Sequence, residues 1–145
     1  MKILMFGRGV IATVYGWVLQ QAGHDVEFYV RPGRVATYGE AIDLDLFDMR
    51  RRVWGQRVVE KWPVRYHEAL EPDHDFDLIV LSVSHHRLAE ATAFLAPRVG
   101  QATVLVFGNI WTEPLAASCC RFSRRAALTC DGTGAVCCCF GRPPG

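Results

Sequence analysis

A glycine-rich turn near the amino terminus constrains the fold of this chain more than any other feature. Residues 7–12 have the sequence Gly-Arg-Gly-Val-Ile-Ala, and an apolar run from Lys2 to Phe6 comes directly before them. Apolar residues then recur at three- and four-residue spacing until Gly23, which is typical of an amphipathic helix. The predicted inner face of that helix consists of Val10, Val14, Trp17 and Val18. A buried strand, a tight turn and a helix in this order predict the start of a β–α–β unit.

The rest of the chain continues this alternation. A second strand is expected over residues 26–30, where Val26, Phe28 and Val30 alternate with Glu27 and Tyr29, and buried strands are expected over 78–83 and 103–107. A hairpin is expected between Ile42 and Val64. The helix between the last two strands has a predicted inner face of Leu88, Ala91, Thr92 and Leu95. This pattern predicts an α/β fold of the Rossmann type, a mostly parallel sheet with helices on both faces and a ligand crevice at the carboxyl ends of its strands.

The glycine turn has the chemistry of a dinucleotide site. The pattern G-x-G-x-x-G/A, directly after a strand and before a helix, lets backbone N–H groups and the positive helix end meet a pyrophosphate. Gly7 would permit the tight turn, Gly9 the close approach of the backbone to the pyrophosphate, and Ala12 the close packing of helix on sheet. The alternative is a turn that serves packing alone.

The residue at the end of the second predicted strand indicates which dinucleotide is bound. An NAD site places a carboxylate there for the ribose hydroxyls, whereas this chain has Arg31. A guanidinium can bind the 2′-phosphate of NADP through two N–H groups, and Arg34 is close enough in sequence to assist. NADP is therefore the predicted cofactor. Two alternatives stay open: Arg31 is a solvated turn residue, or Glu27 is an acceptor in a poor position.

Composition limits the partners. The net charge of +1 lacks the basic excess typical of nucleic-acid binding, and no apolar run reaches the length of about 20 residues that spans a bilayer. We expect a cytoplasmic protein with a small-molecule partner, no nucleic acid and no membrane contact, and an oligomer is left open.

The carboxyl-terminal residues differ from the rest of the chain. All six cysteines lie beyond Ser118, without the C-x-x-C spacing of a zinc site, so no metal is expected. An arginine pair and cysteine runs replace the periodic pattern. We predict a binding domain over 1–116 and an aberrant Cys/Arg-rich tail over 117–145, either unstructured or the product of a frameshift. A redox-active tail is the alternative.

The glycine turn, Arg31 and the runs at 78–83 and 104–109 together resemble the amino-terminal domain of ketopantoate reductases, also called 2-dehydropantoate 2-reductases. The resemblance covers about residues 1–116. It implies NADPH-dependent reduction of 2-dehydropantoate, or of a related 2-keto substrate, on the route to pantothenate. It also implies a helical carboxyl-terminal domain that supplies a lysine acid and an acidic residue, and this sequence is expected to end before that domain. The alternative is a non-catalytic nucleotide-sensing or protein-interaction module.

Two positions depart from the family pattern. Where the family usually has a lysine, this chain has Ser84-His85-His86-Arg87, so that Arg87 or His86 would supply the cation, and Gly108-Asn109 stands where the family has Asn-Gly. His85 and His86 are expected to be a loop pair. No catalytic residue is predicted. The predicted cofactor-binding residues are Gly7, Arg8, Gly9, Val10, Ile11, Ala12, Arg31 and Asn109.

Overall fold

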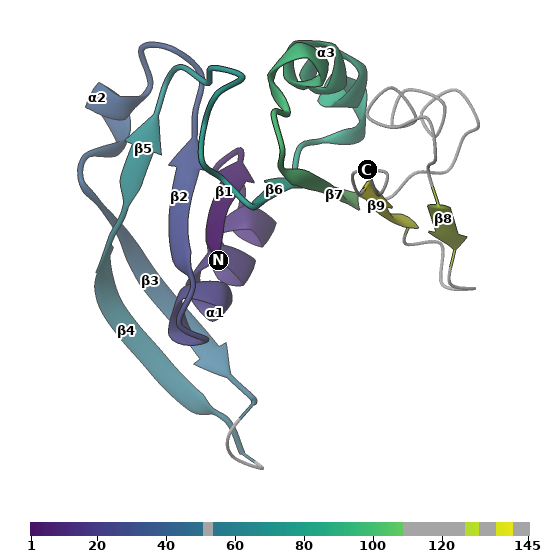
Figure 1. The fold of residues 1–145 in the computed structure, drawn as a ribbon. Coiled ribbons are helices and arrows are strands. Elements are labelled where there is room, and N and C mark those ends of the chain that lie inside the picture. Colours follow the sequence, from purple (N-terminus) through teal and green to yellow (C-terminus); the bar gives the residue numbers. More distant parts are fainter. Residues whose placement is uncertain (51–53, 109–126, 131–135, 141–145) are drawn as a thin grey trace.

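A seven-stranded sheet forms the frame of the described protein. The computed structural model describes residues 1–50, 54–108, 127–130 and 136–140. The strands of this sheet are β1 (Lys2–Phe6), β2 (Asp25–Tyr29), β5 (Arg65–His67), β6 (Leu78–Leu81), β7 (Thr103–Gly108), β8 (Ala127–Cys130) and β9 (Val136–Phe140). Within the described ranges their order is β5-β2-β1-β6-β7-β9-β8, which can be followed across Figure 1. The first five in this order are parallel, which confirms the predicted α/β fold.

Helices cover both faces of the parallel strands, as predicted. The helix α1 (Val10–Gln21) packs with Ile3 and Met5 of β1, while α3 (His85–Leu95) packs with Leu4 and Phe6. Successive side chains of a strand point to opposite faces, so a strand between two helical layers is apolar at every position. The predicted inner face of α3 is confirmed, because its buried residues are Leu88, Ala91, Thr92 and Leu95. A short 3₁₀ turn, η1 (Ala96–Arg98), follows α3.

A hairpin takes the place of a crossover helix between β2 and β5. Its strands β3 (Ala41–Asp48) and β4 (Gln56–Pro63) are antiparallel, which confirms the predicted hairpin. Its inward side chains, among them Ile42 and Trp62, join the apolar cluster on the α1 face. The hairpin runs obliquely past the parallel strands and projects beyond them (Figure 1). The four-residue helix α2 (Val35–Tyr38) comes before it. Neither α2 nor β5 was expected from the sequence.

The predicted inner face of α1 is partly wrong. Val10 is 78% exposed, whereas Ala12 is fully buried and Gly16 is also buried. A Cβ atom at Gly16 would lie 3.1 Å from Phe28 Cζ and 3.2 Å from Met5 Cγ. The helix therefore approaches the sheet along its smallest residues, and the larger apolar residues of its first turn face away from the core.

The segment 117–145, predicted to be either unstructured or the product of a frameshift, contains the two described strands β8 and β9. β9 pairs antiparallel with β7, the last of the parallel strands in the sheet order, and β8 pairs antiparallel with β9. The other residues of 117–145 lie outside the described residues, so the domain boundary at residue 116 stays a prediction. In the described part of the chain, no helix is long and apolar enough to cross a membrane.

Candidate functional site

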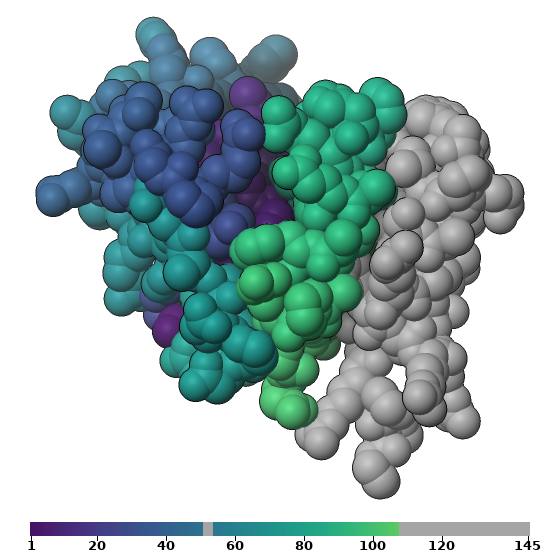
Figure 2. Space-filling view, turned by 90° about the horizontal axis from the view of Figure 1, so that it is seen from above, coloured from purple at the N-terminus to yellow at the C-terminus, as the bar shows by residue number. Residues whose placement is uncertain are grey.

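A cleft of about 1090 Å³ opens at the carboxyl ends of the parallel strands. Its lining comes mainly from residues 6–11 around the glycine turn, residues 29–38 from the end of β2 onward, and residues 82–94 after β6, and it is completed by Tyr15 of α1 and by Val106 and Phe107 of β7. Figure 2 looks onto this end of the molecule, where purple amino-terminal atoms lie in a hollow between the blue segment after β2 and the green segment of α3. The cleft thus occupies the position where open α/β sheets bind their ligands.

The two glycines of the turn meet different surroundings. Gly7 has φ +113°, and a Cβ atom there would lie 2.8 Å from the backbone oxygen of Ser82 at the end of β6. Its N–H donates to the carbonyl oxygen of Tyr29 at 3.1 Å, so Gly7 joins the ends of three neighbouring strands. Gly9 has φ −78°, and a Cβ atom there would meet no described atom within 4 Å. Gly7 is thus required by the fold, whereas Gly9 leaves open space beside the cleft.

The amino terminus of α1 lies at this cleft. Gly9 is its N-cap residue and has no side chain, so no side-chain oxygen accepts from the first-turn N–H groups. Gly9, Val10 and Ile11 all line the cleft. Uncapped N–H groups and the positive end of the helix dipole make such a terminus suitable for an anion.

Four arginines give the cleft a positive charge. Arg8 belongs to the glycine turn, Arg31 and Arg34 follow β2, and Arg87 lies in the first turn of α3. Among the described lining residues, Glu90 is the one acidic side chain. A chain with a net charge of only +1 therefore concentrates cations at this site, and the arrangement favours a ligand with several negative charges.

Glu68 fixes the loop that carries Arg31 and Arg34. Its Oε1 accepts a hydrogen bond from the N–H of Val35 at 2.8 Å. This bond, followed by one from Gly33, holds the pKa of the Glu68 carboxyl below its usual value. The carboxylate comes from the chain after β5, and no sequence motif had marked it as part of a site.

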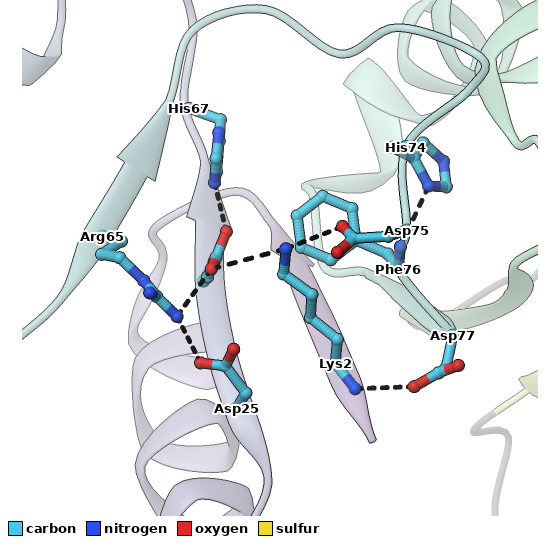
Figure 3. Close-up of polar contacts among 9 residues, drawn as sticks. Lys2, Asp25, Arg65, His67, His74, Asp75, Phe76 and Asp77 are labelled. Carbon is cyan, nitrogen blue, oxygen red and sulfur yellow. Dashed lines mark hydrogen bonds and ion pairs between the residues drawn. The ribbon is translucent and has the colours of Figure 1, made fainter.

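Glu27, the alternative acceptor for an NAD ribose, does not line the cleft. It is 3% exposed, forms ion pairs with Arg65 at 2.7 Å and with Lys2 at 3.9 Å, and is hydrogen-bonded to His67 Nε2. Figure 3 shows the side chains of Arg65, His67 and Lys2 converging beside β2, with Lys2 also bonded to Asp75. The Glu27 carboxylate is thus bound by cations of the protein itself, whereas Arg31, two residues beyond the end of β2, lines the cleft.

The structure brings most of the predicted cofactor-binding residues together. Those on the cleft are Gly7, Arg8, Gly9, Val10, Ile11 and Arg31. Ala12 is buried behind the turn, where it packs α1 on the sheet, and Asn109 lies outside the described residues.

The histidine pair of the 84–87 segment lies in a helix, and one of the two candidate cations of this segment reaches the cleft. His85 and His86 form the first turn of α3 and not a loop, with ring centroids 5.6 Å apart. Of the two candidate cations, Arg87 lines the cleft and His86 does not. The described residues contain no group of three or more His, Cys, Asp or Glu side chains placed to hold a metal ion.

Solved structures share this fold. D-mandelate dehydrogenase, solved with NADH and anilino(oxo)acetate, is similar with a TM-score of 0.61 and 22% identity over 94% of this chain and 45% of that chain. A putative 2-dehydropantoate 2-reductase from Enterococcus faecalis is similar with a TM-score of 0.57 and 20% identity, over 94% of this chain and 45% of that chain. A probable 2-dehydropantoate 2-reductase from Bacillus subtilis is similar with a TM-score of 0.57 and 22% identity, over 75% of this chain and 34% of that chain. This chain thus spans less than half the length of each.

Sequence comparison agrees with the resemblance of the glycine turn and the later strands. No curated protein matches the chain. The profile of the family described as Ketopantoate reductase PanE/ApbA matches residues 3–112, which is most of the chain. This chain belongs to the ketopantoate reductase family.

Proposed function

We propose that the chain binds NADPH and is the cofactor-binding domain of a reductase that acts on 2-dehydropantoate or a related 2-keto substrate. The observation that carries the choice of cofactor is the pair Arg31 and Arg34 on the cleft at the end of β2. An NAD site would need a carboxylate at this position. The one carboxylate in the described lining, Glu90, lies on α3 and not beside β2.

The residues of the cleft fit a dinucleotide phosphate. The first-turn N–H groups of α1 and the open side of Gly9 would receive the pyrophosphate. Arg31 and Arg34 would bind the 2′-phosphate, and Glu68 would keep their loop in place. The bound NADPH would supply the hydride for reduction of the keto group.

The end of β6 provides the opposite wall of the cleft. Ser82, Ser84 and His85 line it. Reduction of a carbonyl also needs a proton donor within hydrogen-bond distance of the developing alkoxide. By resemblance to the family we assign that donor to a helical domain and not to these residues.

A fluorescence titration with NADPH and NADH tests the choice of cofactor. We expect the unchanged chain to bind NADPH more tightly than NADH by a factor of about 10 or more, as charged hydrogen bonds to one phosphate provide. Arg31→Ala should remove most of that preference. Arg57→Ala is the matched control, because Arg57 is paired with Asp45 on the hairpin and does not line the cleft. Equal affinity of the unchanged chain for both cofactors would show that the choice of NADP is wrong.

A turnover assay with NADPH and 2-dehydropantoate addresses the substrate. Robust reduction by this chain would contradict the assignment of the proton donor to another domain. Failure to bind either cofactor would favour the rival prediction of a module for protein interaction. The cytoplasmic location stays a prediction.

A further inference from the structure

Arg8, between the two glycines of the turn, makes contacts that the turn itself does not require. Its Nε donates to the hydroxyl of Tyr66 at 2.7 Å, and its guanidinium lies 4.5 Å from the centre of the Tyr38 ring. The rings of Tyr38 and Tyr66 are themselves 5.9 Å apart. A residue that follows β1 is therefore held by side chains from α2 and β5.

These contacts place the guanidinium on one side of the cleft. β2 lies between β1 and β5 in the sheet, and Tyr66 pairs in register with Phe28, next to the end of β2. The side chain of Arg8 thus extends from the turn toward the β2 and β5 side, where Arg31 and Arg34 begin the segment after β2. In Rossmann-type folds the ribose of the adenosine half lies at the end of this strand.

We infer that Arg8 is a specificity-determining residue that binds the 2′-phosphate of NADP together with Arg31, and that Tyr38 and Tyr66 hold it in position. This inference rests on the proposed function. A guanidinium has five N–H donors, of which the bond to Tyr66 uses one. No other described residue accepts from Arg8, so its terminal nitrogens can present a fork to a phosphate.

The surroundings of Arg8 reduce the cost of binding. A long side chain normally loses rotamer freedom when it orders against a ligand. Arg8 is half-buried and already fixed by a ring face and a hydroxyl, so little of that freedom remains to be lost. Burial raises the pKa of Tyr66, with Arg8 opposing, so this hydroxyl stays neutral and accepts from the arginine at neutral pH.

Adenosine 2′,5′-bisphosphate and 5′-AMP test the inference, because they differ only in the 2′-phosphate. In Arg8→Met we expect the Kd for the bisphosphate and for NADPH to rise by about tenfold or more, while the Kd for 5′-AMP and NADH changes less than about twofold. Methionine keeps an unbranched apolar stem beside Tyr38. Arg57→Met, which removes the same charge from the distant hairpin, should change none of the four values.

Two further variants separate binding from folding. Tyr66→Phe removes the acceptor of Arg8 but keeps the ring that packs 6.0 Å from Phe28, and it should lower the preference for the bisphosphate by a smaller factor. Arg8→Lys keeps the charge without the fork, and it should also lower the preference for the bisphosphate over 5′-AMP. This variant replaces Arg8→Met in the test if Arg8→Met does not fold.

Three outcomes are decisive against the inference. Equal losses for the bisphosphate and 5′-AMP would assign Arg8 to a phosphate that both ligands share. No loss for either would make it a structural link between β1 and β5. In both cases the unchanged chain would still prefer NADPH, so the proposed function would stand. A chain that shows no preference for NADPH before mutation contradicts the proposed function and the inference together.

Discussion

The two glycines of the turn should have separable roles, one in stability and one in binding. Alanine at Gly7 would have φ +113°, a conformation that L-residues rarely adopt, and its Cβ would lie 2.8 Å from the backbone oxygen of Ser82. The carbonyl belongs to the end of a buried strand and cannot move away independently. Backbone strain of this kind costs about 1–3 kcal/mol, and the close contact adds to it.

Alanine at Gly9 meets a different situation. The φ of −78° suits any residue, and no described atom lies within 4 Å of the new methyl group. Alanine is a poorer N-cap than glycine, which lowers the free energy of unfolding by several tenths of a kcal/mol. Alanine also reduces the conformational entropy of the unfolded chain, which raises the free energy of unfolding by about 0.4–1 kcal/mol. The two effects nearly cancel. The methyl group nevertheless stands in the space that we assign to the pyrophosphate.

We therefore expect Gly7→Ala to lower the free energy of unfolding by about 3 kcal/mol or more, and Gly9→Ala to change it by less than about 1 kcal/mol. Urea denaturation followed by circular dichroism measures both. NADPH affinity should fall by about tenfold or more in Gly9→Ala, since the backbone can no longer approach the phosphates closely. Equal stability losses in the two variants would refute the geometric reasoning. Unchanged NADPH affinity in Gly9→Ala would refute the placement of the pyrophosphate.

Three other perturbations test the fold around the site. Gly16→Ala should lower the free energy of unfolding by about 1 kcal/mol in urea denaturation, because three core side chains lie 3.1–3.3 Å from the new Cβ and the overpacking outweighs the gain in helix propensity. Glu27→Gln should cost about 2 kcal/mol in the same assay and leave NADPH affinity unchanged; the 64% exposure of the Arg65 side chain keeps this below the cost of a fully buried pair. The lowered pKa of Glu68 means that its bond to Val35 stabilises the loop above the ordinary glutamate pKa and is lost as pH falls through the lowered value. The Val35 amide signal in NMR should follow this titration, and Glu68→Gln should abolish it.

Comparison of the two long helices shows where periodicity predicts burial and where it does not. The apolar positions of α3 face the sheet, and all four of its predicted inner residues are buried. In α1 the same spacing included Val10, which lines the cleft and is largely exposed. An apolar residue at the start of a helix that opens onto a ligand site contacts the cleft and not the core. Periodicity cannot separate these two environments.

Short elements explain why part of the candidate site was missed. β5 has three residues and α2 has four, and neither is long enough to show a period. Tyr38, Tyr66 and Glu68 lie in or beside these elements. Their contribution depends on a hairpin that brings residues 65–68 back beside β2, and this return is a property of the sheet order. The glycine turn could be predicted, but the side chains that hold Arg8 and the arginine loop could not.

The positions of Glu27 and Arg31 show how a parallel strand assigns different roles to residues only four positions apart. β2 lies between β1 and β5, and all of its residues after Asp25 are buried, whereas Asp25 at its start is exposed. A carboxylate inside such a strand needs cations from neighbouring strands, which Arg65 and Lys2 provide for Glu27. Arg31 lies beyond the last ladder pair, Phe6 with Tyr29, where the backbone leaves the sheet and a side chain can reach the cleft. Under the proposed function, the cofactor thus meets the guanidinium that follows the strand and not the carboxylate buried within it.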